Sequence, residues 1–413
     1  MNAGEKYRYS KMNIGLFSDC YLPTRNGVSQ AVRHLKEGLE ERGHRVLLVT
    51  VSDPDRESEP SSVYTLPSLP FKPSLRLRVG LITAGAVRRL IMREGLDLIH
   101  THTEFAVGRA GRKAGTMLQI PMVHTFHTFY EEYLHFIPFG RALPKESIKP
   151  LMSRFLRPFQ AVICPSRKSQ EYLRRTLPRD NTVLIPNGIP LSPTAGLQGD
   201  GSQPDDDPTD GMARPDRTDK NVILSVGRLS PEKRSLQLVS WLVPLLYNRS
   251  DIELILVGDG PLRRSIQHTI HLRGLDNRIF LTGSLSHEKV QTLYETADLF
   301  ITASLSENHP LSLLEAAAAG LPLIVRDDPG GLDMVRDGIN GFRTEADEQL
   351  PNAVMRLLDT PGLRGEFSRN SRTIAREFSK GLQAARMEDL YFHCLGTSPE
   401  HYSAVTMLTG ERR

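Results

Sequence analysis

The chain lacks the features that mark membrane-spanning and secreted proteins. No apolar run among its 413 residues reaches the roughly 20 residues that cross a bilayer. The first residues, MNAGEKYRYSKMN, have no apolar core of a secretory signal, so export is not expected. The three cysteines are odd in number, widely spaced and outside any metal-ligand pattern. They indicate reduced thiols in a cytoplasmic protein.

The sequence features of NAD enzymes and of nucleic-acid-binding proteins are also missing. The turn before the first predicted helix is not G-x-G-x-x-G, and no acidic residue is placed to hold a ribose, which argues against an NAD enzyme. No recognised binding motif accompanies the basic residues, which argues against nucleic acid as a partner. A composition of 39% hydrophobic and 24% charged residues, with net charge +4, is ordinary for a soluble globular protein with room for two domains.

Short apolar runs without two-residue alternation recur along the chain, as expected for parallel strands that are covered on both faces. Helical patterns lie between them; residues 28–42, for example, carry Val32, Leu35 and Leu39 at helical spacing. This alternation predicts an α/β fold with doubly wound parallel sheets. The predicted strands are 13–18, 45–51, 97–101, 121–126, 161–165 and 182–186, followed by 221–226, 252–257, 278–281, 298–302 and 322–326.

The composition changes between residues 191 and 220, where Pro, Gly, Asp, Ser and Thr replace almost all large apolar residues. This segment predicts a linker or an insertion. It separates two Rossmann-like domains, residues 1–190 and 221–384. In sheets of this kind ligands bind beyond the carboxyl ends of the strands.

Two glutamates frame a predicted helix start in the second domain. The run E-N-H-P-L-S-L-L-E, with the G-L-P that follows it, predicts a helix over residues 310–319. Glu307 then precedes the helix and Glu315 lies about 7–8 Å along its axis, with free N–H groups near Leu311 and Ser312 between them. Amides suit phosphate and carboxylates suit sugar hydroxyls, so the pattern predicts a nucleotide-sugar site. The alternative is an ordinary amphipathic helix with two solvated acids.

Basic residues and glycines follow other predicted strands. After strand 221–226, Arg228 and Lys233 can clamp a diphosphate, although a basic surface turn has the same pattern. The glycine-rich turn 258–260 lets backbone come close to a ligand. In the first domain, Gly27 precedes a helix and would let the helix N-terminus approach a phosphate.

Four histidines gather near the ends of two predicted strands of the first domain. His124 lies inside strand 121–126, the position of a satisfied core histidine. His127 falls at the carboxyl edge of that strand, where it can bind a hydroxyl or a sugar. His100 and His102 sit at the end of another strand. The clustering suggests a binding site at this edge of the sheet.

Residues 139–179 contain ten Lys or Arg against two acids. In the first part of this stretch Lys145, Lys149, Arg154 and Arg157 are interleaved with apolar residues, which suits an anionic membrane surface. Each cation near such a surface contributes about 1 kcal/mol. Because prolines interrupt the stretch, it predicts one or two short helices. The alternative is a helix that faces the core and has a solvated basic side.

Four motifs together resemble the retaining glycosyltransferases of glycosyltransferase family 4, which have the GT-B fold. They are the E-x7-E element, G-R-L-x-x-E-K (227–233), V-G-D-G-P-L (257–262) and I-P-N-G-I (185–189). The resemblance implies two Rossmann-like domains that face each other across a cleft, the first for the acceptor and the second for the nucleotide sugar. It also implies that residues 385–413 form a helix that crosses back to the first domain, and then a tail.

The resemblance implies a role for each candidate residue. Arg228 and Lys233 hold the donor diphosphate, with the helix end at Leu311 and Ser312 beside it and Gly27 near the donor. Glu315 holds the ribose and Glu307 the transferred sugar. His127 lies beside the reacting sugar. The family chemistry implies transfer with retention at the anomeric carbon, without a metal or another cofactor.

Two further runs, 124–136 and 100–105, look most like those of bacterial diacylglycerol glucosyltransferases, and the first contains Tyr130 and Tyr133. This implies transfer of glucose from UDP-glucose to a lipid acceptor, by an enzyme bound peripherally to the inner face of the cell membrane. The chain departs from its relatives with Asn26 before Gly27, where Gly-Gly is common, and with Ala318. Phosphatidylinositol, a cell-surface glycan intermediate or a soluble molecule are alternative acceptors. A nucleotide-sugar epimerase and an inactive sugar-binding protein are alternatives of another class.

Overall fold

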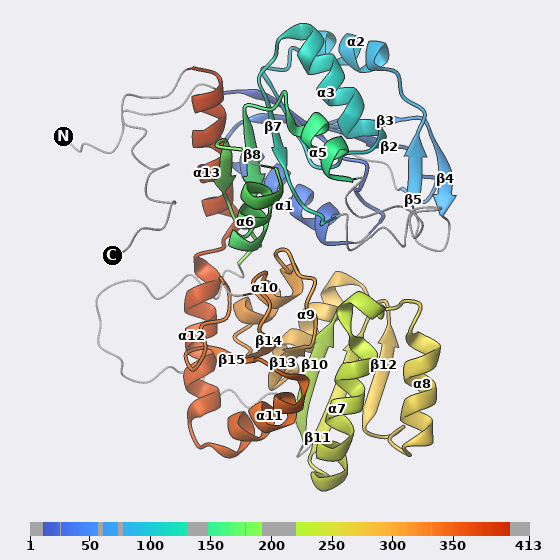
Figure 1. Cartoon of the computed structure of the whole chain (residues 1–413), viewed down its shortest axis with the longest axis vertical. Helices are drawn as coiled ribbons and strands as arrows, with labels where there is room; N and C mark the ends of the chain where they lie inside the picture. The colour runs from blue at the N-terminus through green and yellow to red at the C-terminus, as the bar shows by residue number, and fades with distance from the viewer. Residues whose placement is uncertain are drawn as a thin grey trace, which may run out of the picture. The chain divides into compact units, whose positions relative to one another are not determined.

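The computed structural model describes residues 11–24, 26–56, 61–72, 77–129, 148–177, 179–191, 220–331 and 333–396. The chain forms two compact units, which Figure 1 shows with their elements labelled. Unit 1 comprises Met1–Gly188 and Lys380–Arg413, and unit 2 comprises Ile189–Ser379. Most of the predicted linker, residues 192–219, lies outside the described residues.

Unit 1 is built on a seven-stranded sheet in the order β3-β2-β1-β6-β7-β8-β9, with every neighbouring pair parallel. The six strands predicted for this domain are present as β1, β2, β6, β7, β8 and β9. Strand β3 and the antiparallel pair β4–β5 were not predicted. The elements are β1 (Asn13–Phe17), α1 (Gly27–Glu41), β2 (Arg45–Val51), β3 (Val63–Leu66), β4 (Ser68–Lys72), β5 (Leu77–Gly80), α2 (Ala84–Glu94), β6 (Leu98–Thr101), α3 (Ala106–Leu118), β7 (Met122–Thr125), α5 (Ile148–Leu156), β8 (Ala161–Cys164), α6 (Arg167–Thr176), β9 (Thr182–Leu184) and α13 (Lys380–Cys394).

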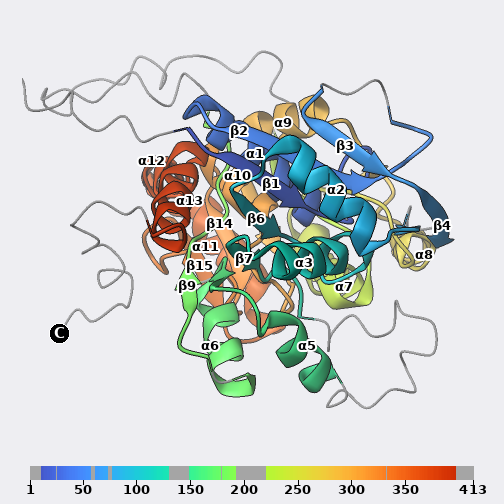
Figure 2. The same cartoon turned by 90° about the horizontal axis from the view of Figure 1, so that it is seen from above.

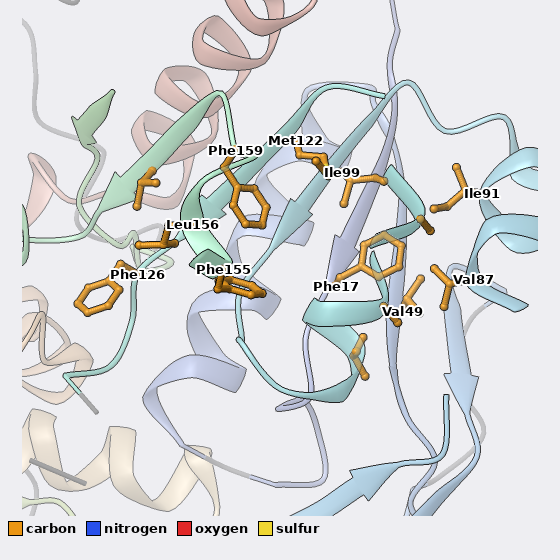
Figure 3. Packing of buried hydrophobic residues seen from close by; sticks show 14 of the residues in the cluster. Phe17, Val49, Val87, Ile91, Ile99, Met122, Phe126, Phe155, Leu156 and Phe159 are labelled. Carbon is orange, nitrogen blue, oxygen red and sulfur yellow. The ribbon is translucent and has the colours of Figure 1, made fainter. Parts of the chain in front are cut away.

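Helices cover both faces of the unit 1 sheet, because alternate strand residues point to opposite sides. In β1, Ile14 and Leu16 pack with α1 and α13, while Phe17 packs on the other face. There, Figure 3 shows Phe17 and Val49 close to Val87 of α2. Figure 2 shows α2 and α3 side by side on this face. Burial on both sides explains why these strands read as continuous apolar runs.

Helix α1 begins with a capping box at Asn26. The Asn26 side chain accepts a hydrogen bond from the Ser29 N–H (2.9 Å), and Ser29 Oγ accepts one from the Asn26 N–H (3.0 Å). Asn26 therefore supplies the N-cap of α1. Gly27 is the exposed first residue of the helix, and a Cβ added there would meet no atom within 4 Å.

The last described helix, α13, belongs to unit 1. It begins at Lys380, earlier than the residue 385 expected from the sequence. Its buried residues Met387 and Leu390 join the core cluster of β1 and α1. On the same helix Glu388 is buried and accepts hydrogen bonds from His44 (2.7 Å) and from Arg42 Nε (3.0 Å).

Unit 2 has a six-stranded parallel sheet in the order β12-β11-β10-β13-β14-β15. The five strands predicted for this domain are present as β10 to β14, and β15 was not predicted. The elements are β10 (Asn221–Val226), the 3-10 helix η6 (Pro231–Lys233), α7 (Ser235–Asn248), β11 (Ile252–Val257), α8 (Arg263–Leu272), β12 (Ile279–Gly283), α9 (His287–Thr296), β13 (Leu299–Thr302), α10 (Leu311–Ala318), β14 (Leu323–Arg326), β15 (Gly341–Thr344), the 3-10 helix η7 (Asp347–Gln349), α11 (Leu350–Asp359) and α12 (Leu363–Arg376).

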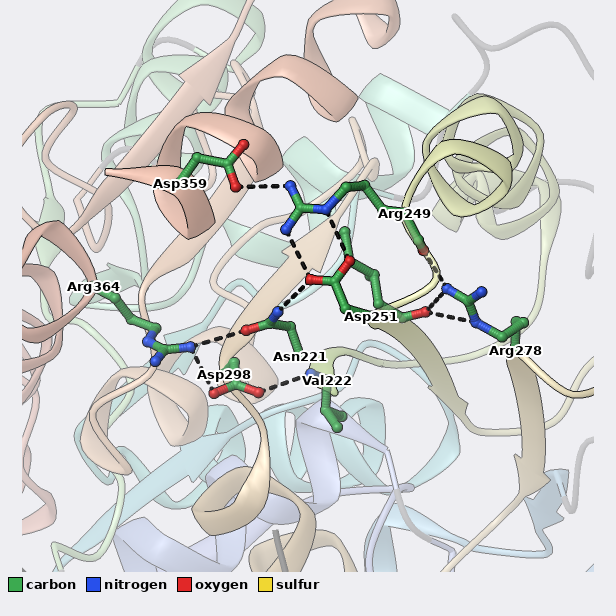
Figure 4. Close-up of polar contacts among 9 residues, drawn as sticks. Asn221, Val222, Arg249, Asp251, Arg278, Asp298, Asp359 and Arg364 are labelled. Atoms are coloured by element: carbon green, nitrogen blue, oxygen red, sulfur yellow. Dashed lines mark hydrogen bonds and ion pairs between the residues drawn. The ribbon is translucent and has the colours of Figure 1, made fainter. Parts of the chain in front are cut away.

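A network of charged side chains ties together the amino ends of the unit 2 strands (Figure 4). Arg249 donates to both carboxylate oxygens of Asp251 (2.8 Å each) and to Asp359 (2.7 Å). These hydrogen bonds lower the pKa of Asp251 to about 2. Arg364 donates to Asp298 (3.0 Å), which lies directly before β13. The network stands at the end of the strands away from their carboxyl-end loops, so its role is to fix the sheet.

Each sheet has one point where the strand order reverses. In unit 1 this point lies between β1 and β6, and in unit 2 between β10 and β13. Ligands of doubly wound sheets bind at the carboxyl ends of the strands at such a point. The loops after β1, β6 and β7 in unit 1, and after β10 and β13 in unit 2, are therefore the candidate sites.

Candidate active site

In unit 2 the two loops at the switch point bring a predicted cation and a predicted carboxylate together. Lys233 ends η6 after β10, and Glu307 lies in the loop after β13. Because β10 and β13 are neighbours in the sheet, Lys233 Nζ donates to Glu307 Oε1 at 2.6 Å. Both side chains are partly exposed, at 26% and 13%. A charged pair at a switch point is suited to binding a polar, anionic ligand.

Glu307 is held by the turn that follows β14. Asp328 is buried and accepts hydrogen bonds from the N–H groups of Glu307 (2.8 Å) and Gly330 (3.2 Å). A Cβ on Gly330 would lie 1.8 Å from the Glu307 carbonyl oxygen, so only glycine fits there. Sequence reasoning did not identify Asp328 or Gly330. An acidic residue and a glycine that follow a strand closely are nevertheless a recognisable turn signal.

The predicted helix after Glu307 is confirmed as α10, with Pro310 and Ala319 as its flanking residues. No side chain caps its N-terminus, so the first-turn N–H groups at Leu311 and Ser312 lie outside the intrahelical ladder. Glu315 is half-buried and accepts a hydrogen bond from the Tyr294 hydroxyl of α9 (3.2 Å).

Tyr294 was missed by sequence reasoning. Burial, and then the charge of Glu315, raise the pKa of this tyrosine well above its ordinary value, so the hydroxyl stays protonated and acts as a donor to Glu315. The tyrosine is almost fully buried and it orients the carboxylate. Nothing in the sequence pairs α9 with α10, which is why the contact could not be predicted.

Arg228 stands in the loop after β10, supported by the glycine-rich turn after β11. Gly258 has φ +133°, and a Cβ there would lie 2.0 Å from the Gly227 carbonyl oxygen. The N–H of Leu229 also donates to the Asp259 carbonyl (3.0 Å). The turn therefore approaches the segment that carries Arg228 and holds it in place, while its approach to a ligand stays a prediction.

His309 lies between Glu307 and α10 and was not singled out from the sequence. Its ring is 6% exposed, neither ring nitrogen has a hydrogen-bond partner, and burial lowers its pKa to about 3. It packs on Phe378, with ring centroids 5.6 Å apart. A neutral polar ring is thus buried beside the candidate donor loop at a free-energy cost.

In unit 1 the four histidines do meet at the carboxyl ends of β6 and β7. His124 is a satisfied core histidine, as predicted: its nitrogens contact Thr101 Oγ1 (2.8 Å) and Glu104 Oε1 (3.2 Å). His127 is half-buried after β7, and its Nε2 lies 3.1 Å from Nδ1 of His102. His100 and His102 are buried.

The described part of the basic segment forms α5 and the residues after it. Met152, Phe155 and Leu156 are buried in the core, whereas Arg154 and Arg157 are exposed and Lys149 is half-buried. Helix α5 therefore has an apolar side that faces the core and a solvated basic side, with Leu151 as an exposed apolar residue on it at 60%. The predicted acceptor or membrane residues Tyr130, Tyr133 and Lys145 lie outside the described residues.

Two kinds of feature are missing from the described residues. No group of three or more His, Cys, Asp or Glu side chains in that part of the chain is placed to hold a metal ion. Among the same residues, no helix combines the length and the apolar character needed to pass through a bilayer.

Two doubly wound units, with polar and charged side chains at their switch points, have the architecture expected of GT-B glycosyltransferases. Comparison with known proteins places the chain within that class. The profile of Glycosyltransferase Family 4 matches residues 25–193, and that of Glycosyl transferases group 1 matches residues 211–374. The chain belongs to glycosyltransferase family 4 and is a glycosyltransferase.

Curated relatives match over most of their length. The α-monoglucosyldiacylglycerol synthase of Acholeplasma laidlawii is 30% identical, with 92% of this chain and 96% of the relative covered. The enzyme of the same name from Streptococcus pneumoniae is 29% identical, with coverage of 85% and 80%. The phosphatidylinositol N-acetylglucosaminyltransferase GPI3 subunit of Saccharomyces cerevisiae is 29% identical, with coverage of 78% and 69%.

Solved structures share the fold. HepE from Anabaena, determined in complex with UDP and glucose, has a TM-score of 0.69 at 19% identity, covering 92% of this chain and 99% of that one. Sucrose-phosphate synthase from Thermosynechococcus elongatus has a TM-score of 0.70 at 21% identity, covering 94% and 100%. At these identities the likeness establishes the fold.

Proposed function

We propose that the protein is a retaining hexosyltransferase that moves glucose from UDP-glucose to a membrane lipid, 1,2-diacylglycerol. The observation that carries the proposal is the Lys233–Glu307 pair at the switch point of unit 2, beside the uncapped start of α10. Relatives named α-monoglucosyldiacylglycerol synthase, similar over most of the chain, support the choice of sugar and acceptor. HepE, which shares the fold and was crystallised with UDP and glucose, supports the choice of donor.

The donor is held by unit 2 in this scheme. Arg228 and Lys233 bind the diphosphate together with the first-turn amides of α10, because cations and free N–H groups stabilise the charge that builds up on a departing nucleoside diphosphate. Glu307 binds hydroxyls of the transferred glucose, and release of its carboxylate from Lys233 accompanies diphosphate binding. Glu315, oriented by Tyr294, binds the ribose.

The reaction needs no metal or other cofactor in this scheme. The bond from the anomeric carbon to the diphosphate breaks, and the acceptor oxygen attacks from the same face, which gives retention. A diphosphate oxygen takes the proton of the acceptor hydroxyl. His127 orients the transferred glucose and supports the charge of the oxocarbenium-like sugar.

The acceptor is reached at a membrane surface. The exposed cations of α5 and its neighbours support this, since Arg154, Arg157 and the partly buried Lys149 have no acidic residue within the helix to offset them. Tyr130, Tyr133 and Lys145 belong to the same acceptor region by sequence. The enzyme then works as a peripheral protein at the inner face of the cell membrane.

Phosphatidylinositol is the second candidate acceptor. The similarity to the yeast phosphatidylinositol N-acetylglucosaminyltransferase subunit favours it, and the same basic surface suits its anionic headgroup.

The test is nucleoside-diphosphate release from UDP-glucose in anionic mixed micelles. Three acceptor conditions are compared: diacylglycerol, phosphatidylinositol and detergent with anionic lipid alone. Release that requires diacylglycerol, with a glucosylated lipid of α configuration by NMR, is the expected result. Release with phosphatidylinositol alone replaces the acceptor, release in every micelle contradicts a lipid acceptor, and none in any micelle contradicts the donor.

A further inference from the structure

The histidine cluster of unit 1 contains a pair in which one ring can set the state of the other. His102 Nδ1 lies 3.1 Å from His127 Nε2, and the two ring centroids are 5.4 Å apart with planes 26° from parallel. One of the two nitrogens must carry the proton of this hydrogen bond. Which one it is decides whether His127 donates or accepts through its other nitrogen.

The second nitrogen of His102 settles the question. His102 is 3% exposed, and its Nε2 is buried without a hydrogen-bond partner. Burial, and then the neighbouring rings of His100, His127 and His124, lower the pKa of His102 well below its ordinary value, so the ring is neutral and has a single N–H. With the proton on Nε2, a buried donor would stay unsatisfied. With the proton on Nδ1, it is shared with His127 and only a lone pair lacks a partner, which is the less costly arrangement.

We propose that His102 is a positioning residue that donates its Nδ1–H to His127 Nε2 and so holds His127 as the neutral tautomer protonated on Nδ1. His127 then acts on the transferred sugar as a hydrogen-bond donor and takes no part in proton transfer. If Nε2 of His127 carried a proton, the Nδ1–H of His102 would lose its acceptor. His102 would otherwise have to carry its own proton on its buried Nε2. The inference rests on the proposed function only for the identity of the ligand that His127 contacts.

A third ring keeps His102 in place. The ring centroid of His100 is 4.0 Å from that of His102, at 34°. His100 is fixed by contacts of both its nitrogens, to the Tyr391 hydroxyl of α13 (2.6 Å) and to Thr125 Oγ1 (2.7 Å). The three rings His127, His102 and His100 therefore form a row, and His100 at its end contacts the Tyr391 hydroxyl of α13.

Other ionisable groups near the pair are engaged elsewhere. His124, on β7, is bonded to Thr101 at the end of β6 and to Glu104 in the loop after it. Asp19, after β1, accepts from the Thr103 hydroxyl (2.6 Å) and from the Val107 N–H (2.9 Å). These contacts leave the hydrogen bond between His102 Nδ1 and His127 Nε2 in place, so the proton of His102 makes Nε2 of His127 the acceptor.

The proposal is tested by two-bond ¹H–¹⁵N correlation spectra of the full-length protein with labelled histidine, which report the protonation of each ring nitrogen directly. The His127 signal is assigned by its loss in His127→Ala. Two variants are compared: His102→Asn, whose amide places an N–H donor near the position of Nδ1, and His102→Leu, which has no donor. Thermal unfolding checks that each variant is folded.

In the wild type and in His102→Asn, we expect His127 to be neutral and protonated on Nδ1 from pH 5.5 to 8. In His102→Leu we expect the Nε2-protonated tautomer. We expect kcat in His102→Leu to fall about tenfold or more, with KM for the donor changed less than twofold, and His102→Asn to restore most of kcat.

An Nε2-protonated or titrating His127 in the wild type overturns the proposal, and so does an unchanged tautomer in a folded His102→Leu. If that variant does not fold, the tautomer in the wild type and in His102→Asn still decides. Because the spectra require no sugar, a wild type that shows the expected tautomer but does not use UDP-glucose contradicts the proposed function alone.

Discussion

Lys233 and Glu307 contact each other at 2.6 Å, so each side chain balances the charge of the other in the ligand-free protein. Replacing Lys233 with Ala removes the cation and leaves a carboxylate facing the place proposed for the diphosphate. We therefore expect Lys233→Ala to abolish UDP-glucose binding in calorimetry while the circular dichroism spectrum is unchanged. Lys220→Ala is the matched control, because Lys220 pairs with Glu253 (2.7 Å) at the amino ends of the strands. Equal donor affinity in Lys233→Ala and wild type would contradict the diphosphate assignment.

Gly330 offers a test of how the loop position controls Glu307. A Cβ at residue 330 would lie 1.8 Å from the Glu307 carbonyl, whereas one at residue 331 would have no contact closer than 3.7 Å. We expect Gly330→Ala to raise the Kd for UDP-glucose about tenfold by displacing Glu307, and Gly331→Ala to change it less than twofold. Calorimetry measures both, and similar affinities for the two variants would show that the loop adapts without moving the carboxylate.

His309 makes the free energy of unfolding depend on pH. Its pKa is about 3 in the folded protein, against about 6.5 when unfolded. Between these values the unfolded state binds the extra proton, so stability falls as the pH is lowered from about 6.5, by up to about 1.4 kcal/mol per pH unit. His309→Phe keeps a buried ring without orphaned nitrogens, and we expect it to raise stability by about 1–3 kcal/mol at pH 7 and to flatten the acid slope.

Urea unfolding from pH 4 to pH 7 measures this effect. The control is His268→Phe, because His268 is exposed on α8 and its replacement should leave the slope as in the wild type. If His309→Phe and the wild type lose stability in parallel below pH 6.5, the ring of His309 has partners in solution and the assignment is wrong.

At the scale of residues, sequence reasoning found the charged groups and missed their supports. Arg228, Lys233, Glu307 and Glu315 stand out because their types and spacing match a motif. Tyr294 and the orphaned nitrogens of His309 do not, because their importance comes from burial and from contacts between elements distant in the sequence. His102 was noticed as part of a cluster, but its hydrogen bond to His127 is a property of neighbouring strand ends.

Among the elements, α5 joins a buried apolar side to an exposed basic one. We expect the combined variant Lys149→Gln, Arg154→Gln and Arg157→Gln to weaken sedimentation with phosphatidylglycerol liposomes. With about 1 kcal/mol per cation, the partition coefficient should fall about a hundredfold, and the difference should be larger at low salt.

A matched variant distinguishes the effect of the basic side of α5 from the effect of net charge. Arg264→Gln, Arg273→Gln and Lys289→Gln remove three exposed cations from unit 2, and liposome binding should change little. If both triple variants bind liposomes equally, the basic side of α5 has no special role at the membrane.

The elements that sequence reasoning missed share a physical cause. Strand β15 reads G-F-R-T at the edge of its sheet, where one glycine and one arginine break the apolar pattern. Strand β3 is also an edge strand, and the pair β4–β5 lies outside the main sheet. Central parallel strands are recognisable by continuous apolar runs, whereas an edge strand was predicted only where its run is apolar, as in β9 and β12.

For the whole molecule, the contacts of Glu388 determine how firmly α13 is attached to the rest of unit 1. Its carboxylate is 3% exposed and bonds His44 and Arg42, while His44 Nδ1 accepts from the Met12 N–H (3.3 Å). We expect Glu388→Gln to lower the free energy of unfolding by about 1–3 kcal/mol, because buried partners lose a charged acceptor. Urea unfolding measures this.

Glu377→Gln is the control for that prediction, since Glu377 pairs with Arg336 on the surface, with side chains 51% and 45% exposed. An exposed pair contributes about 0–1 kcal/mol, so the control should unfold much like the wild type. A Glu388→Gln variant that is no less stable than the control would mean that packing alone fixes α13.

The contacts of α13 also limit how far unit 1 can fold while the chain is being synthesised. Ribosomes release the residues of β1 and α1 early, yet Ile14, Leu16 and Leu35 share their core cluster with Met387, Leu390 and Tyr391. Residues 189–379 are translated in between and form a unit of their own. During synthesis, one apolar face of the first sheet must therefore wait for α13, and this is the stage at which chaperones have a surface to bind.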